Sequence, residues 1–83
     1  MAFRVMYFAW LRERIGVPSE DIEAKVKSVS ELVEHLKGKE ERYALAFQDV
    51  SAVKVAINQE LSDFDAALKG GEEVAFFPPM TGG

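Results

Sequence analysis

The sequence contains no cysteine and only one histidine, His35. Without cysteine the chain has no disulfide or thiolate metal site, which fits a reducing compartment. A single histidine gives no recognisable zinc-ligand spacing, and no serine or aspartate stands at a spacing that suggests a catalytic triad with it. We therefore expect no metal site, and we interpret His35 as a surface or helix-edge residue rather than a catalytic base.

Long hydrophobic runs and clusters of basic residues are also missing. The apolar runs are too short for a membrane-spanning helix, and the first ten residues lack the basic leader of a signal peptide, so the cytoplasm is the predicted compartment. Ten basic residues face 14 acidic ones, for a net charge of −4. Because nucleic-acid binding needs clustered Lys and Arg to neutralise phosphates, this charge balance argues against it.

The 83 residues, 48% of them hydrophobic, predict a single domain over 1–83 with one core. Alternating apolar residues predict strands over 3–10, 20–26, 51–60 and 73–77. A helix is predicted over 28–39, capped by Ser30 and ended by Gly38, with a weaker helical pattern through Tyr43, Leu45, Ala46 and Val50. We expect a helical turn over 11–16, a turn at Asn58–Gln59, an irregular segment around Leu61 and a hairpin turn over 68–73.

This order of elements predicts an α+β fold. The first two strands are joined by a short connection, which suggests a hairpin, and the helical crossover that follows suggests a mixed sheet packed on one main helix. That plan is the β-grasp fold of ubiquitin-like proteins. The two-residue period places Phe3, Val5 and Tyr7 on one face of the first strand. Phe8 falls on the opposite face, where an exposed apolar patch would need a partner.

The sequence ends in "AFFPPMTGG", which is unusual for a terminus. In the last strand Val74 and Phe76 share one face, whereas Phe77 lies on the other. Two prolines then forbid helix and further sheet pairing and hold the chain extended. Gly82 and Gly83 have no Cβ, so they can enter a tunnel too narrow for other residues. A frayed end is the simpler interpretation, but this order of residues favours a functional, flexible tail over 78–83.

These segments together resemble a known family. The ending "FFPPMTGG" and the early segment "MYFAWLRERIG", with "RYALAFQDV", "VAINQEL" and "LKGGEEVAFFPP" in the same order and spacing, closely resemble the MoaD family of ubiquitin-like sulfur carriers, the small subunits of molybdopterin synthase. The resemblance runs over the whole chain. A Gly-Gly ending alone is weak evidence, but the combination with the N-terminal motif is specific.

The resemblance implies a carrier with no bound cofactor and no catalytic side chains of its own. An E1-like, MoeB-type enzyme would use ATP to adenylate the Gly83 carboxylate, and a sulfur donor system would convert it to a thiocarboxylate (1-thioglycine). The tail would then enter a MoaE-type large subunit, in a heterotetramer of two small and two large subunits. There the sulfur would pass to a cyclic pyranopterin phosphate precursor, and two such transfers would form the molybdopterin dithiolene.

The resemblance also implies roles for particular residues. Phe8, Leu61 and Phe77 match positions that pack on the large subunit and on the activating enzyme, and Arg12 matches an arginine near the tail. Met80 and Thr81 would line the entry path, and Gly82 would let the backbone pass. Other interpretations are a sulfur carrier for another pathway such as thiamin thiazole synthesis, a ubiquitin-like modifier joined to lysines of target proteins, and an interaction module with an incidental tail.

Overall fold

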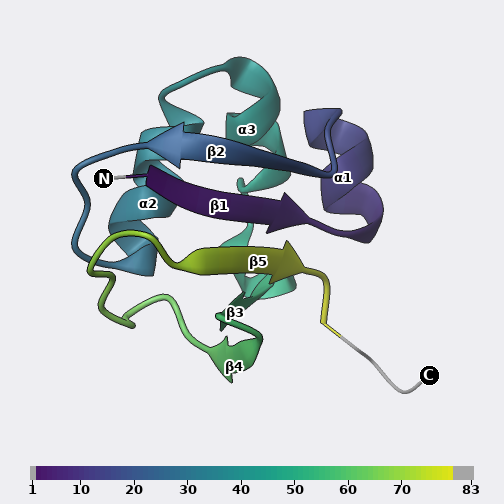
Figure 1. Ribbon diagram of the computed structural model, residues 1–83. Coiled ribbons are helices and arrows are strands. Elements are labelled where there is room, and N and C mark those ends of the chain that lie inside the picture. The colour runs from purple at the N-terminus through teal and green to yellow at the C-terminus, as the bar shows by residue number, and fades with distance from the viewer. Residues whose placement is uncertain (1, 80–83) are drawn as a thin grey trace.

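The computed structural model describes residues 2–79, which form a five-stranded mixed sheet with helices on one face (Figure 1). The strands are β1 (Ala2–Tyr7), β2 (Ser19–Glu23), β3 (Lys54–Ile57), β4 (Glu60–Ser62) and β5 (Glu73–Phe77). The helices are α1 (Ala9–Ile15), α2 (Val29–Lys37), α3 (Glu41–Ala46) and the 3₁₀ helix η1 (Val50–Ala52). The strand order is β2-β1-β5-β3-β4, with β1 and β5 parallel and the other pairs antiparallel. The predicted α+β β-grasp fold is confirmed.

The core lies between the helices and one face of the sheet. Phe3, Val5 and Tyr7 of β1 are buried, as the two-residue period predicts, and so are Val74 and Phe76 of β5. The Phe76 ring meets Phe47 edge to face at a centroid distance of 5.0 Å and also packs near the rings of Tyr7 and Phe64. Phe76 is therefore the aromatic centre that joins the sheet to the segment after α3.

Helix α2 buries its whole predicted stripe, Val29, Leu32, Val33 and Leu36, and it ends at Gly38 as expected. The predicted cap was wrong by two residues. Ser28 has extended backbone angles, and its side chain accepts the Glu31 N–H at 3.2 Å. Ser30 instead donates its hydroxyl to the Phe64 carbonyl at 2.8 Å, and so it tethers the long loop after β4 to the helix.

The predicted first strand is too long. β1 ends at Tyr7, because Ala9 has a φ of 55° and turns the chain from the strand into α1. Residues 8–10 therefore leave the sheet. β1 and β2 are antiparallel as predicted, and the helical turn predicted over 11–16 is confirmed as part of α1, which ends at Gly16 and makes the connection longer than a hairpin loop.

Two other expectations for the second half of the chain were wrong. Leu61 lies in strand β4 rather than in an irregular segment. The segment 68–73 is no hairpin turn, because it leads into β5, which pairs with β1 and β3 and not with β4. The weaker helical pattern is confirmed in part, since α3 contains Tyr43, Leu45 and Ala46, whereas Val50 begins η1. Tyr43 and Ala46 are buried together with Phe47, and Leu45 and Val50 are exposed. The Asn58–Gln59 turn between β3 and β4 is confirmed.

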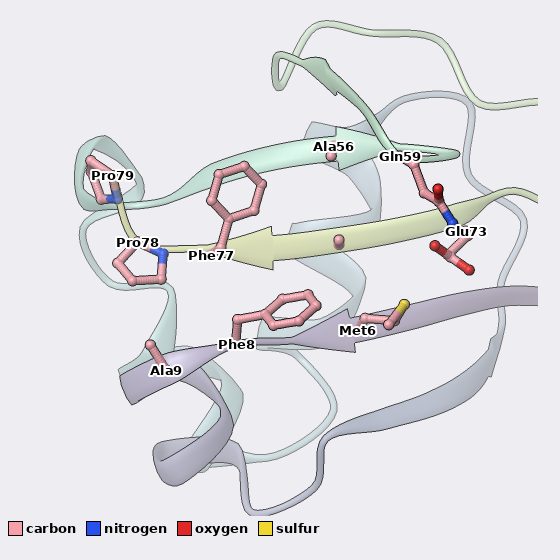
Figure 2. Close-up of a pocket in the computed structure, with 10 residues that line it drawn as sticks. Met6, Phe8, Ala9, Ala56, Gln59, Glu73, Phe77, Pro78 and Pro79 are labelled. Atoms are coloured by element: carbon pink, nitrogen blue, oxygen red, sulfur yellow. The ribbon is translucent and has the colours of Figure 1, made fainter. Parts of the chain in front are cut away.

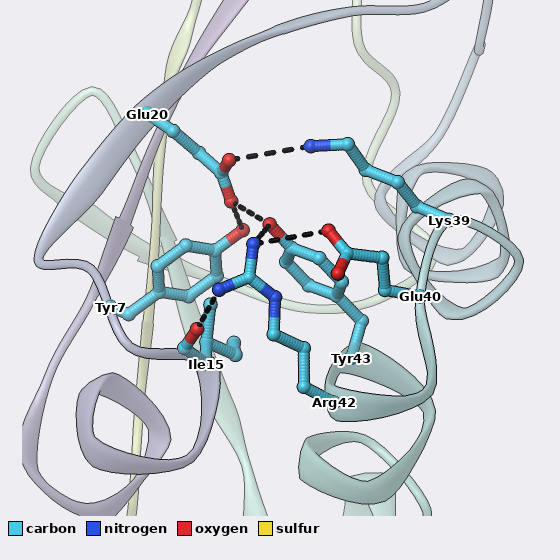
Figure 3. A network of polar contacts seen from close by, with 7 residues as sticks. All are labelled: Tyr7, Ile15, Glu20, Lys39, Glu40, Arg42 and Tyr43. Atoms are coloured by element: carbon cyan, nitrogen blue, oxygen red, sulfur yellow. Dashed lines mark hydrogen bonds and ion pairs between the residues drawn. The ribbon is translucent and has the colours of Figure 1, made fainter.

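A polar network covers one edge of this core (Figure 3). The Glu20 carboxylate of β2 accepts the hydroxyl of Tyr7 at 2.9 Å and that of Tyr43 at 2.6 Å. Lys39 approaches the same carboxylate at 3.5 Å. Burial by itself raises the pKa of Glu20, but the hydrogen bonds from the two tyrosines and the charge of Lys39 outweigh it and hold that pKa below its ordinary value. The ionised carboxylate thus connects β1, β2 and α3.

Replacing Glu20 with Gln is expected to lower the free energy of unfolding and to flatten its dependence on pH. The wild-type carboxyl has a depressed pKa in the folded state, so its contribution is complete above the ordinary value of 4.5 and is lost as the pH falls below it. Urea unfolding at several pH values between neutral and acid checks this. A wild-type protein that loses no more stability in acid than the Gln variant would contradict it.

Candidate functional site

One row of side chains crosses the open face of the sheet, which the helices do not cover. The strand register places Met6 of β1 beside Ala75 of β5, Ala75 beside Ala56 of β3, and Ala56 beside Leu61 of β4. Residues opposite each other in a sheet point to the same face. Because the two central members are alanines, the middle of the open face is low and its borders stand above it.

This low region is an apolar groove of about 630 Å³ (Figure 2). The two alanines form its floor, and larger side chains from β1, from the turn after β3 and from the end of β5 form its borders. The residues that line it are Met6, Phe8, Ala9, Ala56, Gln59, Glu73, Ala75, Phe77, Pro78 and Pro79. A concave, largely apolar surface of this kind is suited to bind part of another protein.

The structure brings together Phe8 and Phe77, which were predicted to lie opposite the core (Figure 2). Phe8 is 42% exposed, and its N–H donates to the Phe76 carbonyl at 3.1 Å, which holds it beside the end of β5. Leu61 is on the same face and 75% exposed, but it lies beyond Ala56 and does not line the groove. Their role in binding a partner stays a prediction.

The predicted tail begins at the edge of the groove. Pro78 and Pro79 follow β5 and line one end of the groove, so the last four residues start from there. Met80, Thr81, Gly82 and Gly83 lie outside the described residues. Arg12 is exposed on α1, is not among the residues that line the groove and forms no ion pair within residues 2–79.

Two polar residues of the groove were not predicted from the sequence to belong to the site. Gln59 of the turn after β3 and Glu73 at the start of β5 lie at the end of the groove away from the prolines (Figure 2). The sequence pattern predicted Gln59 only as a turn residue and Glu73 only as the first residue of a strand. The register of β3 against β5 brings both to the groove, and that register is not visible in either segment alone.

The groove presents apolar surface with few polar groups. Among residues 2–79, no group of three or more His, Asp or Glu side chains could hold a metal ion. The groove contains one carboxylate and one amide but no nucleophile paired with a base. Within the described part of the chain, no helix has the length and apolar character needed to cross a bilayer.

Comparisons with known proteins agree on one family. The ThiS family model matches residues 5–83. The molybdopterin synthase sulfur carrier subunit of Escherichia coli is 41% identical over 80 residues, which cover 96% of this chain and 98% of that protein.

Two solved structures extend this agreement to the fold. A Pyrococcus furiosus protein described as subunit 1 of molybdopterin converting factor superposes with a TM-score of 0.78 at 30% identity, covering 96% of this chain and 99% of that one. The structure of the complex between subunits 1 and 2 of molybdopterin-converting factor from Helicobacter pylori matches with a TM-score of 0.66 at 26% identity, with both chains fully covered. With a family match over nearly its whole length, the β-grasp fold and these relatives, the chain belongs to the ThiS family.

Proposed function

We propose that this chain is the sulfur carrier subunit of a molybdopterin synthase, with residues 1–83 as one carrier domain and 78–83 as its tail. The observation that carries the proposal is the position of the groove: β5, which supplies part of its floor, runs directly into Pro78 and Pro79, and only Met80 and Thr81 separate these prolines from the Gly-Gly sequence. A partner bound in the groove would therefore meet the tail. The sulfur carrier relatives, matched over nearly their full length, support the same assignment.

In this proposal Gly83 carries the reacting group. An E1-like enzyme would use ATP to convert its carboxylate, a poor electrophile, into an acyl-adenylate with a good leaving group. Sulfur from a donor would displace AMP and leave a thiocarboxylate. The sulfur is a soft nucleophile that stays attached to a protein, so it cannot diffuse away before it reaches the pyranopterin precursor.

We further propose that the groove docks on the large subunit of the synthase and on the activating enzyme in turn. Phe8 and Phe77 would supply the apolar contacts at the groove, and Leu61 would extend them to the edge of the sheet. Arg12 would contribute near the tail. The catalytic side chains would then belong to the large subunit, which is consistent with a groove that offers apolar surface but no nucleophile and base.

Replacing Phe77 with Asp is expected to weaken binding to the large subunit, because the complex would bury an unpaired carboxylate where an aromatic ring packs. Leu45→Asp is a matched control, since Leu45 is also exposed but does not line the groove. Calorimetric titration of each variant with the large subunit compares the two. Equal affinity of Phe77→Asp and wild-type protein would remove Phe77 from the interface.

The mass of the intact protein tests the proposed function directly. The chain is incubated with ATP, an activating enzyme and a sulfur donor, and we expect the mass change for one oxygen replaced by sulfur, located on Gly83 by fragmentation. A protein-modifier role would instead give isopeptide-linked conjugates in cell extract. An unchanged mass, with the same activating enzyme converting a known sulfur carrier, would refute the carrier proposal.

A further inference from the structure

Left-handed backbone angles on non-glycine residues cluster at the groove. Within residues 2–79 these residues are Ala9, with a φ of 55°, Asn58, with 50°, and Gln59, with 71°. Ala9 and Gln59 both line the groove, and Asn58 precedes one of them. Such angles are costly for residues with a side chain and persist where the surrounding structure holds them, often at functional sites.

Asn58 has a structural reason for its angle, whereas Gln59 has none among the described contacts. The Asn58 side chain accepts the Glu73 N–H at 3.0 Å, and its own N–H donates to the Glu73 carbonyl at 2.8 Å. Asparagine is also well tolerated in this conformation, and a two-residue hairpin turn of this kind favours Asn followed by Gly. A glutamine in the glycine position keeps a side chain where the backbone would be more stable without one.

That side chain lies at the groove beside a carboxylate without an ion-pair partner in the described residues (Figure 2). Arg4 is next to Glu73 in the sheet register, but its guanidinium pairs with Asp21 at 2.7 Å. Gln59 and Glu73 thus present an amide group and a carboxylate at the end of the groove away from the prolines. The carboxylate can accept hydrogen bonds from a cationic side chain, best of all a guanidinium, and the amide oxygen can accept from the same group.

We propose that Gln59 and Glu73 form a polar clamp that binds a basic side chain of the large subunit and so sets the direction in which this subunit docks. This inference rests on the proposed function and assigns residues that determine its specificity. Glu73 and Phe77 are four residues apart on β5, which corresponds to about 13 Å. One apolar and one charged contact at that separation define an orientation, which a single apolar contact does not.

The charges along the groove support one direction of docking. Lys54 is directly opposite Phe77 in the register, so the tail end carries a positive charge and the clamp end a negative one. A partner with a basic residue at the clamp meets complementary charges in one orientation and like charges in the reverse one. The tail leaves from the positive end, and the clamp therefore directs it toward a defined place on the partner.

Glu73→Gln tests the clamp by removing its charge with little change in shape, and Glu60→Gln is the matched control. Glu60 is next to Gln59 but opposite Ile57, whose side chain packs on the core side, so Glu60 points away from the groove. We expect Glu73→Gln to weaken binding of the large subunit about tenfold, as for loss of a charged hydrogen bond, and to reduce the dependence of affinity on salt. Glu60→Gln should bind like the wild type.

Gln59→Gly provides a second test that separates binding from folding. Glycine relieves the left-handed angle, so the melting temperature should rise while the affinity for the large subunit falls. Wild-type affinity in either Gln59→Gly or Glu73→Gln would overturn the clamp. If Phe77→Asp weakens binding but Glu73→Gln does not, the clamp fails and the carrier function stands; if Gly83 is never converted to a thiocarboxylate, the proposed function itself fails.

Discussion

Removal of Gly83 is expected to abolish sulfur transfer to the pyranopterin precursor and to leave the free energy of unfolding unchanged. Residues 2–79 contain the core and the five strands that the structure describes, so we expect the fold to form without the last residue. Shortening an extended chain by one residue moves its terminal carboxylate by about 3.5 Å. Because a misplacement of about 1 Å can cost a reaction roughly a hundredfold in rate, the shortened tail should not react.

Two measurements check this expectation. Molybdopterin formation is assayed with the large subunit and the activation system, and urea unfolding compares stability. A second variant carries one extra glycine after Gly83. It keeps the Gly-Gly ending but displaces the terminal carboxylate in the other direction, so it tests the position of the carboxylate separately from the loss of a residue. Both variants should be inactive and as stable as the wild type. Sulfur transfer by the shortened protein would show that the terminal carboxylate of Gly83 is not the reacting group.

Replacing Phe76 with Ala is expected to lower the free energy of unfolding by about 3–5 kcal/mol. Phe76 is fully buried, and its ring contacts three other aromatic rings of the core. A chain of 83 residues has a stability of about 4–12 kcal/mol, so this single change removes a large part of it. Phe76→Leu should cost less, about 1–2 kcal/mol, and it keeps the measurement possible if the Ala variant does not fold.

The adjacent Phe77 provides the control, because it lies on the opposite face of the same strand. Phe77→Ala should change the stability by less than about 1 kcal/mol but weaken binding to the large subunit. Urea unfolding and calorimetric titration of both variants separate the two roles. Two neighbouring phenylalanines with similar effects on stability would contradict the assignment of one to the core and the other to the groove.

Local patterns in the sequence were sufficient for the elements whose residues are consecutive. The stripe of α2 and the alternation in β1 and β5 each place their apolar residues correctly, because periods of 3.6 and 2 residues follow from backbone geometry alone. The same alternation put Phe8 and Phe77 on the face opposite the core. The cap of α2 was missed because Ser28 and Ser30 are equally good capping residues, and only the contact of Ser30 with Phe64 distinguishes them.

Features that depend on distant segments could not be predicted in this way. The end of β1 depends on the left-handed angle at Ala9, and β4 is a three-residue edge strand whose pattern is too short to detect. Leu45 fits a helical stripe as well as Phe47 does, and the packing against Phe76 decides which one is buried.

The sequence by itself determined the β-grasp plan, the family and the Gly-Gly ending, because each depends on the order and spacing of residues along the chain. Only the tertiary structure places Met6, Ala75, Ala56 and Leu61 in one row across the open face of the sheet. It also shows that the two alanines form the floor of a groove and that Gln59 and Glu73 line one end of it. The physical reason is strand register, which brings together residues up to 69 positions apart and is set by packing of the whole core.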